Sequence, residues 1–574
     1  CHRDGVQPYL LYLTEMCMNL DSLTLLIGAS ASAYLVLKAH RRLQLSRAKH
    51  SGLSGHVRMA KRVSKLIPHY NLEGDSFFSC DGAHDSIVEK RRKGFQELSH
   101  ELLGRAPQGK RLLEQAIGSI SDAQFTHKYR VPFQFRNMVN ENLLPALFLS
   151  KSQGVHVWDI DGNEYIDVTG AYGTNLLGYD TYKSFIRQAA VDMDTLGPVL
   201  GPYHPVVLDN TRRILALAGQ DEISYHMSGT EAVMQAVRLA QYHTGRQRIV
   251  RFAGAYHGWW GDVQPGIGNP VSADRTLTLK EMSQRTLHVL ATRKDIACVL
   301  VNPLQALHPN TNAPGDSALI SSGRKAGYDK EAYTQWLKQL RQVCTESGIV
   351  LILDEVFLGF RLAKGGAQDY FGVRADMVTY GKTLGGGLPV GVLCGKAELM
   401  KRYRNNKPAD ICFARGTFNS HPYVMQTMNL FLKHIDSVEI ERMYQNVDTT
   451  WNTRRAALNK RLSELELPVE VQNMTSIFTI LYNKPSRFNW MFQFYLLKAS
   501  VMLSWVGTGR MIFSHNYTDS DFDVFCDRFI QAARCMQADG WWDTSEACNS
   551  NKKIQRRVLK ETWRALTSSI GSIS

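Results

Sequence analysis

Short apolar runs alternate with segments of helical periodicity through the middle of the chain. Ile349 to Leu353 is a continuous apolar run, and Met377 to Tyr380 and Arg248 to Phe252 are strand-like as well. Residues 233–240 instead place valines and alanines at helical spacing. Strands that are apolar throughout are typical of parallel sheets that are covered on both faces. The pattern therefore predicts an α/β protein with a mostly parallel sheet.

The first 65 residues carry a different pattern. Ser22 to Leu37 are uncharged and mostly apolar over 16 positions, whereas Lys38 to Lys65 contain nine Lys or Arg and no Asp or Glu. An apolar segment with a basic flank is typical of a membrane anchor whose basic side faces the cytoplasm. A spanning helix needs about 20 apolar residues, and Glu15 and Asp21 limit extension upstream. A buried or interfacial helix is the alternative.

Residues Asn19 to Leu23 support another interpretation of the same region. Asp21-Ser22-Leu23 is similar to the core of an acyl-carrier domain, in which the serine carries phosphopantetheine. Only 21 residues precede Ser22, too few for a complete carrier domain, and the segment that follows is unusually apolar. The chain begins with Cys1 rather than methionine, as a fragment or a processed product does.

Lys382 follows the apolar run that ends at Tyr380 and precedes the glycines Gly385 to Gly387. An amine in this position reaches a bound molecule with little steric crowding. A lysine amine forms a Schiff base with an aldehyde such as pyridoxal phosphate (PLP) when a dry or cationic surrounding lowers its pKa. From this segment alone, a surface lysine before a glycine turn is the alternative.

Three further motifs agree with this chemistry. Asp354 ends the run 349–353, where open α/β sheets bind ligands, and a carboxylate there keeps a pyridine nitrogen protonated. Ser228-Gly229-Thr230 precedes the helical segment, and hydroxyl and N–H groups at a helix start bind phosphate. Tyr256-His257 offers a ring that stacks on a planar cofactor. Taken singly, a helix cap, an ordinary N-cap and a buried structural tyrosine explain these residues too.

Together and in this order, the motifs resemble the fold-type I PLP enzymes, specifically the class III aminotransferases. The similarity is greatest to the branch that holds glutamate-1-semialdehyde aminomutase and the aminotransferase domains embedded in polyketide synthases. It extends from Tyr129 to about Trp542. Its further motifs are Val157-Trp158-Asp159-Ile160-Asp161-Gly162-Asn163-Glu164-Tyr165-Ile166-Asp167, Asp354-Glu355-Val356-Phe357-Leu358-Gly359-Phe360-Arg361 and Gly365-Gly366-Ala367-Gln368-Asp369-Tyr370-Phe371-Gly372-Val373.

The resemblance implies a large domain with a mostly parallel sheet of the seven-stranded type, a smaller α+β domain and PLP as the cofactor. It makes Lys382 the Schiff-base and proton-transfer residue, and it pairs Asp354 with the pyridine nitrogen. The remaining cofactor contacts that it implies are Ser228, Gly229 and Thr230 at the phosphate, Tyr256 on the ring, His257 beside it, Gln305 near the ring hydroxyl, and Thr417, whose phosphate contact crosses a dimer interface. The expected working unit is a homodimer with shared active sites.

Several positions depart from the family pattern. Asn302 stands where relatives usually carry glutamate, which changes the charge around the ring. Pro132 to Arg136 is more similar to the synthase-embedded transaminases than to the aminomutase, and Trp505 to Arg510 also differs from the aminomutase pattern. Arg136 and Arg361 are candidates for gripping a substrate carboxylate with both guanidinium nitrogens. A structural ion pair is the alternative for each.

Composition narrows the class of protein further. The ten cysteines include no C-x-x-C pair, so we expect no metal site and no disulfide framework, and we expect a reducing compartment. The net charge of +14 is suited to an acidic carrier protein or an anionic membrane surface as a partner. No nucleic-acid module is recognisable. The expected location is the cytoplasmic face, with residues 22–37 as the candidate membrane anchor.

The predicted domains follow from these motifs. They are an N-terminal extension with a helical part and a basic linker (1–125), a first part of the small domain (126–205), the large PLP-binding domain (206–417), the C-terminal part of the small domain (418–545) and a basic tail (546–574).

The expected activity is transfer of an amino group from an amino-acid donor to an aldehyde or keto acceptor. Similarity to synthase-embedded domains indicates a long-chain or carrier-bound acyl acceptor in a biosynthetic pathway. A PLP-dependent aminomutase, which moves the amine within one substrate, is the first alternative. A non-catalytic scaffold is the second, and intact Lys382, Asp354 and Thr230 argue against it.

Overall fold

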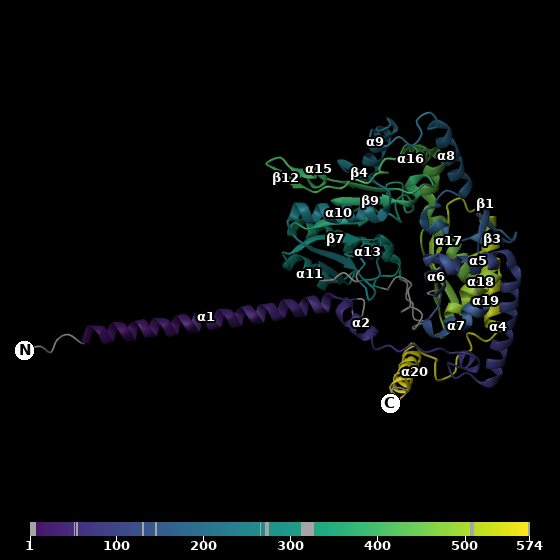
Figure 1. Cartoon of the computed structure of the whole chain (residues 1–574), viewed down its shortest axis with the longest axis horizontal. Helices are drawn as coiled ribbons and strands as arrows, with labels where there is room; N and C mark the ends of the chain where they lie inside the picture. The colour runs from purple at the N-terminus through teal and green to yellow at the C-terminus, as the bar shows by residue number, and fades with distance from the viewer. Residues whose placement is uncertain are drawn as a thin grey trace, which may run out of the picture.

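The computed structural model consists of a two-domain body from which one long helix projects (Figure 1). It describes residues 7–50, 52, 55–128, 131–143, 146–264, 266–269, 275–310, 327–504 and 510–571, without the side chains of residues 7–24, 26, 127–128 and 569–571. Residues 505–509 of the segment that departs from the aminomutase pattern therefore lie outside the described residues, and so does the side chain of Ser22.

A seven-stranded sheet forms the centre of the large domain. Its order is β4-β10-β9-β8-β7-β5-β6, and among these described strands β10 runs in the opposite direction to the other six. In that order the strands span Glu222–His226, Gly391–Gly395, Met377–Gly381, Val350–Asp354, Ile296–Val301, Arg248–Phe252 and Thr276–Leu279. The predicted α/β class with a mostly parallel sheet is confirmed.

Both faces of this sheet are buried, because consecutive side chains of a strand point to opposite sides. On β7, Cys298 and Leu300 pack in the core formed with α10 (Gly229–Thr244), whereas Val299 and Val301 belong to the core on the other side. Helices that contribute to that second core are α9 (Val206–Ala218), α11 (Gln284–Thr292), α13 (Lys330–Ser347), α14 (Gly366–Phe371) and α16 (Pro422–His434). At the β4 end lie α15 (Ala397–Met400) and the hairpin of β11 (Tyr403–Arg404) and β12 (Lys407–Ile411).

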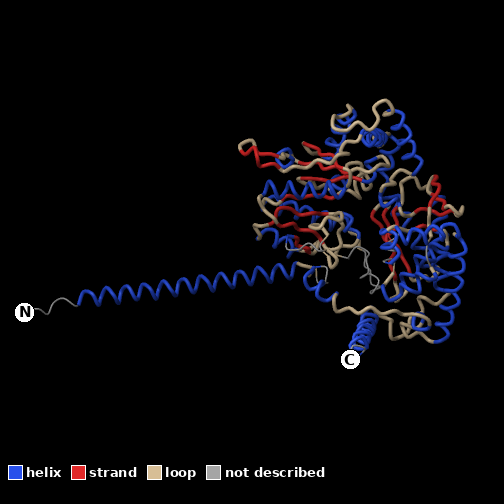
Figure 2. Tube along the Cα trace, viewed as in Figure 1, coloured by secondary structure: helices blue, strands red, loops and turns tan. Residues whose placement is uncertain are grey.

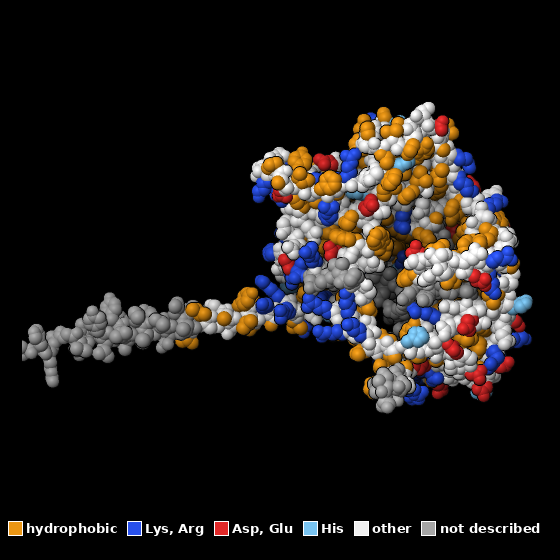
Figure 3. Space-filling model, in the orientation of Figure 1, with side chains coloured by type: hydrophobic (Ala, Val, Ile, Leu, Met, Phe, Trp, Pro, Cys, Tyr) orange, Lys and Arg blue, Asp and Glu red, His pale blue; other side chains and the backbone are white. Residues whose placement is uncertain are grey.

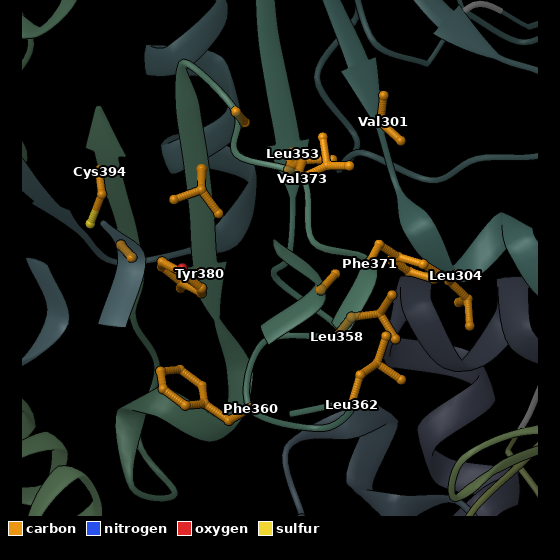
Figure 4. Close-up of a cluster of buried hydrophobic side chains, with 14 of the residues drawn as sticks. Val301, Leu304, Leu353, Leu358, Phe360, Leu362, Phe371, Val373, Tyr380 and Cys394 are labelled. Atoms are coloured by element: carbon orange, nitrogen blue, oxygen red, sulfur yellow. The ribbon is translucent and has the colours of Figure 1, made fainter. Parts of the chain in front are cut away.

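The second core packs against the strand ends that carry the candidate chemistry. Figure 4 shows Leu353, the last apolar residue of β8, and Tyr380 of β9 in this core, with Phe371 of α14 in the same cluster. Asp354 directly follows Leu353, and Lys382 follows Tyr380 after Gly381. Their backbones are therefore held by close packing on both sides.

The small domain is built around two further sheets. One has the order β1-β2-β3-β15, spanning Leu149–Gln153, His156–Asp159, Glu164–Asp167 and Val501–Met502, and the other has the order β13-β14-β16, spanning Val469–Met474, Ile477–Tyr482 and Arg510–Ile512. Its helices are α7 (Arg136–Asn142), α17 (Val438–Glu464), α18 (Phe492–Lys498) and α19 (Asp519–Ala538), with short 3-10 turns at Phe133–Phe135, Gly170–Gly173 and Asn489–Met491.

The predicted domain boundaries at residues 205 and 417 are displaced. α8 (Tyr179–Asp192) and α16 pack against each other, and their buried residues belong to the core of the large domain. α16 also contacts η6 (Lys382–Gly385), where Thr427 donates a hydrogen bond of 2.8 Å to the carbonyl of Gly385. The turn that carries Lys382 is thus supported by a helix that the prediction assigned to the small domain.

The N-terminal extension is part of the small domain, so the predicted boundary at residue 125 is wrong. Phe77, Phe95 and Leu98 are buried in the small-domain core together with residues of α18 and α19. The helices of the extension after α1 are α2 (Val57–Ser64), α3 (Asp75–Phe78), α4 (Asp85–Arg105), α5 (Pro107–Ser119) and α6 (Ser121–Lys128). An apolar core shared by these segments explains why the extension does not act as a linker.

Arg91 of α4 fixes the extension to the C-terminal part of the small domain. Its guanidinium is fully buried and pairs with Asp81 through two hydrogen bonds of 2.9 and 2.8 Å. It also donates to the carbonyls of Gly540 and Asp543, at 3.0 and 2.8 Å. Its carbon Cζ lies 4.7 Å from the centroid of the Phe488 ring. One side chain therefore joins three segments that are far apart in sequence.

Both ends of the chain form helices. α1 (Gln7–Ala48) contains residues 22–37 and the segment similar to a carrier domain, and it projects from the body (Figure 2). At its end, Lys49 bridges to Leu279, which attaches α1 to the edge of the large sheet. α20 (Asn551–Gly571) is held by Arg487, which donates to Glu561 at 2.6 and 2.9 Å. The predicted basic tail is thus partly anchored.

Within the part of the chain that the structure describes, none of the helices is both long and apolar enough to cross a membrane.

Replacing Arg91 by alanine leaves Asp81 as an uncompensated buried charge, which costs about 3–5 kcal/mol. We expect a large fall in the melting temperature. Arg92→Ala is the matched control, since the neighbouring Arg92 pairs with the exposed Asp75, and exposed pairs contribute little. Thermal unfolding of both variants, followed by circular dichroism, measures the difference. Equal melting temperatures of the two variants would show that Arg91 does not fix the extension to the small domain.

Candidate active site

Two neighbouring parallel strands place a carboxylate and an amine at the same edge of the large sheet. Asp354 is the last residue of β8 and pairs in register with Thr379 of β9. Lys382 begins η6, directly after β9. Its φ of 48° is in the left-handed region, which costs a non-glycine residue about 1 kcal/mol or more. The packing of η6 against α16 maintains this conformation.

A cavity of about 840 Å³ lies at these strand ends. The sequence-predicted residues that line it are Ser228, Gly229, Thr230, Tyr256, His257, Asp354 and Lys382. They come from four separate segments of the chain, so the structure brings together most of the residues that the motifs singled out. The remaining walls are mainly apolar and include Val356, Phe357 and Ile512.

Asp354 is buried and held by hydrogen bonds. His257 Nδ1 lies 2.8 Å from Asp354 Oδ2, and the backbone N–H of Val356 and the hydroxyl of Thr379 donate to Oδ1 at 3.2 and 3.3 Å. Burial lowers the pKa of His257, and the hydrogen bond to Asp354 opposes this shift. A neutral His257 can donate this hydrogen bond to Asp354 through Nδ1.

Lys382 lies in a dry environment. Burial is the largest influence and lowers the pKa of its amine; the negative charge of Asp354 raises it, and the positive charge of Arg361 lowers it. Its Nζ lies 5.8 Å from the centroid of the Phe357 ring. A lowered pKa increases the fraction of neutral amine, which is the form that attacks a carbonyl.

The first turn of α10 points its N-terminal end at the cavity wall. Ser228 caps the helix by accepting from the N–H of Glu231 at 3.2 Å, and Gly229 and Thr230 follow at the cavity wall. A Cβ on Gly229 would collide with Val356, and one on Gly258 would lie 2.6 Å from Thr230 Oγ1. Both glycines thus allow the backbone to approach closely at a helix N-terminus, where N–H groups and the helix dipole favour an anion.

Asn302, the residue that departs from the family pattern, supports the loop of Tyr256. Its side-chain amide donates to the carbonyl of Tyr256 at 3.0 Å, and its Oδ1 accepts from the N–H of Leu304 at 3.2 Å. It thereby caps η5 (Pro303–Leu307) and joins the end of β7 to the loop after β5. An amide performs both tasks without adding charge to the cavity wall.

Other predicted contacts do not line this cavity. Gln305 is buried behind it and donates to the carbonyl of Gly254 at 2.9 Å. Thr417 is exposed on this chain, so a contact to phosphate from it requires a second subunit. Arg136 is half-buried at the start of α7 and is not among the cavity-lining residues.

Arg361 does not line the cavity either. It is 1% exposed and donates to the carbonyls of Phe513 and Asn175, at 2.8 and 3.0 Å, and to the hydroxyl of Ser476 at 3.1 Å. These bonds join the loop after β8 to both sides of the small domain. The printed hydrogen bonds of Arg361 go to carbonyls and a hydroxyl rather than to a carboxylate, so they differ from the ion pair that was the alternative to substrate binding.

Arg510 lines the cavity, and the sequence motifs did not single it out as a site residue. It begins β16, and its Nη2 lies 3.2 Å from Nε2 of His308. Tyr172 and Thr174 line the cavity near it. Their backbones are close to Arg361, whose bond to Gly173 spans 3.4 Å. Of these two arginines, Arg510 lines the cavity and Arg361 does not. Only the folded structure reveals this difference.

The arrangement defines a fold-type I PLP enzyme, and comparisons with known proteins agree. The sequence model described as "Aminotransferase class-III" matches residues 138–533. The chain is 32% identical over 353 residues to glutamate-1-semialdehyde 2,1-aminomutase of Methanocaldococcus jannaschii, which covers 58% of this chain and 76% of that protein. The chain belongs to the class III aminotransferase family.

Solved structures show the same fold. A transaminase with PLP bound has a TM-score of 0.61 and 24% identity, covering 76% of this chain and 99% of its own. A glutamate-1-semialdehyde aminomutase from Pseudomonas aeruginosa has a TM-score of 0.62 and 18% identity, covering 79% of this chain and 99% of its own. Family membership makes the chain a PLP-dependent enzyme. The buried amine, the buried carboxylate and the N-terminal end of α10 fit that cofactor.

The two arginines should respond differently to substitution. Arg361→Ala leaves buried carbonyls without donors, which costs about 3 kcal/mol or more, and lowers the melting temperature. Arg510→Ala is expected to leave the melting temperature nearly unchanged and to raise KM for carboxylate substrates about tenfold or more, as for a lost charge-assisted bond. Melting curves and steady-state kinetics check this. A KM defect in Arg361→Ala without loss of stability would reverse the assignment.

The ionisation of Lys382 is also testable. Because burial lowers its pKa from 10.5, the rate at which PLP-free enzyme is reductively methylated at Lys382 should reach its half-maximum below that pH. Asp354→Asn removes a charge that favours the ammonium form and should lower this midpoint further. Mass spectrometry of the Lys382 peptide after labelling at a series of pH values measures it. A midpoint at or above that of exposed lysines would contradict the burial argument.

Proposed function

We propose that the enzyme transfers an amino group from an amino-acid donor to an aldehyde or ketone, with Lys382 as the residue that binds PLP and moves the proton. The observation that carries this proposal is the shared cavity of Lys382 and Asp354, one buried amine and one buried carboxylate at adjacent strand ends. PLP, when bound, condenses with amines and accepts the electrons released when a Cα–H bond breaks.

Each residue has one task in this proposal. Asp354, positioned by its three hydrogen-bond donors, is proposed to stabilise a positive charge on the pyridine nitrogen. Gly229 and Thr230 bind the phosphate at the start of α10. Tyr256 covers the ring. Lys382, released when a donor amine takes its place, accepts the proton from Cα in neutral form and returns it on the acceptor side.

The cofactor contacts proposed for Gln305 and Thr417 require a further change, either a side-chain rotation or a second subunit. Gln305 Oε1 is buried with no hydrogen-bond partner among the described residues, so a small rotation toward the cavity would cost it no existing bond at that atom. Thr417 acts only in a homodimer. Five of the large apolar side chains that are exposed outside α1, Tyr256 of the cavity wall among them, would be removed from water by burial in a dimer interface. They are Tyr203, Tyr256, Trp259, Phe413 and Phe418.

The acceptor is proposed to be an apolar aldehyde or ketone, including a long-chain or carrier-bound acyl group. The cavity walls of Val356, Phe357, Leu388 and Ile512 support an apolar substrate, and Arg510 is placed to bind the carboxylate of the amino donor. An aminomutase is the second candidate, because the curated relative of 32% identity carries that name. It differs in needing no external donor.

Lys382→Ala should abolish the visible absorbance of the PLP Schiff base and lower kcat by about a thousandfold or more, since it removes nucleophile and base together. Lys330→Ala is a control at a lysine of α13. Wild-type protein treated with single amino acids should lose the visible absorbance and release a keto acid. Conversion of one substrate to its amino isomer without any donor would favour an aminomutase. If the absorbance responded to none of the amines, a non-catalytic scaffold would be the better interpretation.

A further inference from the structure

A basic groove of about 980 Å³ lies where α1 meets the large domain, and it shares no lining residue with the active-site cavity. It is bounded by the end of α1, by α2 and by the edge strand β6. Figure 3 shows Lys and Arg side chains gathered at this junction. The N-terminal cations that line it are Lys38, Arg41, Arg42, Lys49, Arg58 and Arg62.

The charge of the basic groove is not balanced within its own walls. No Asp or Glu occurs among the described residues that line it. Arg248 and Arg293 also line it, and both pair with Asp295 at 2.6 Å. Burial and then the positive charges of Arg58, Arg248 and Arg293 lower the pKa of Lys49. Like charges held this closely raise the free energy of the protein, and an anionic ligand would offset that cost.

An exposed apolar arm leads out of the groove. We define the apolar arm as residues 25–37 of α1, the side chain of residue 26 excepted. Tyr34, Leu35, Val36 and Leu37 are each more than half exposed, and four consecutive residues cover all sides of a helix. Figures 1 and 2 show this part of α1 away from the domains. Lys38 and Arg41 follow within one turn.

We propose that the apolar arm and the basic groove together bind the surface of a membrane that contains anionic phospholipids. The arm enters the hydrocarbon, and the groove binds the phosphates of the headgroups. Binding of this kind needs two signals, an apolar insertion and a polybasic patch, because either alone gives weak and reversible attachment. Both occur here on one helix and at adjacent positions.

The length of the arm agrees with insertion into the membrane rather than passage through it. The 13 uncharged residues 25–37 rise about 20 Å as a helix, which is shorter than a hydrocarbon core of about 30 Å. With the arm inserted, Lys38, Arg41 and Arg42 reach the depth of the headgroups. The groove walls from α2 and β6 then face the same interface.

Charge argues against a second copy of this chain as the occupant. The chain carries a net charge of +14, so self-association through the groove would bring like charges together. A small phosphate ester is suited to the groove but leaves the apolar arm without a partner. An anionic membrane is the one occupant that matches both features.

The test uses the full-length, PLP-loaded enzyme and co-sedimentation with vesicles. We expect binding to phosphatidylcholine vesicles that contain about 30% phosphatidylserine, and little binding to phosphatidylcholine alone. The groove variant is Lys38→Gln, Arg41→Gln, Arg42→Gln and Arg62→Gln combined. It should weaken binding by up to about a thousandfold, since each of the four cations contributes about 1 kcal/mol at such a surface.

The matched control removes the same charge from α20. It is Lys552→Gln, Arg556→Gln, Lys560→Gln and Arg564→Gln combined, all at exposed positions. This variant should bind vesicles nearly as the wild type does. An arm variant, Leu35→Gln with Val36→Gln, should keep binding at low salt and lose it at high salt, because only the screened electrostatic part remains. Unchanged PLP absorbance and melting temperature show that each variant is folded.

Three outcomes would overturn the proposal. Equal losses in the groove and α20 variants would show that net charge alone causes binding. No binding to anionic vesicles, with inorganic pyrophosphate raising the melting temperature of the wild type but not of the groove variant, would make the groove a site for a soluble phosphate compound. A change of oligomeric state in the arm variant, without a change in vesicle binding, would assign the arm to self-association.

Discussion

The register between β8 and β9 is the constraint on which the site depends. These parallel strands pair Asp354 with Thr379, so that a carboxylate and the amine of Lys382, three residues further along, open into one cavity. Because the side chains of both strands are buried on each face, a shift of the register by one residue would exchange the side chains that pack on the two faces and disturb both cores. Everything else in the site is arranged around this pair of strand ends.

Burial determines the chemistry of Asp354 and Lys382, and it also costs free energy. A carboxylate removed from water needs hydrogen-bond donors, and His257, Thr379 and the N–H of Val356 supply them to Asp354. The same dry environment lowers the pKa of Lys382. The left-handed backbone of Lys382 adds local strain, which the contact between η6 and α16 offsets. Reactivity is thus maintained by packing that lies outside the cavity.

The strand ends and the cofactor motifs were predictable because each is a short, continuous segment. The run 349–353 and the turn at Ser228 carry their own periodicity and capping pattern, and the structure places both as expected. Contacts between distant segments gave no such signal. Arg361 was predicted as a substrate residue, yet it donates to carbonyls more than 150 positions away, and Arg510 enters the cavity by a strand pairing that the sequence does not reveal.

The structure of the N-terminal region could also be predicted only in part from the sequence. Its charge pattern was visible, but the basic groove also needs Arg248 and Arg293, which only folding brings to it. The core that joins Phe77 to α18 and α19 was equally invisible, because Phe77 belongs to no periodic segment. Local sequence patterns therefore predicted the sheet and the strand ends of the large domain well. They predicted poorly how the N-terminal extension packs against the rest of the protein.

The most direct test of the account is to locate the residue that holds PLP. Purified enzyme would be reduced with borohydride, digested and analysed by mass spectrometry. We expect a pyridoxyl modification on the peptide that contains Lys382 and on no other lysine peptide. Modification of a different lysine, or an unmodified Lys382 peptide in protein that retains PLP, would contradict it.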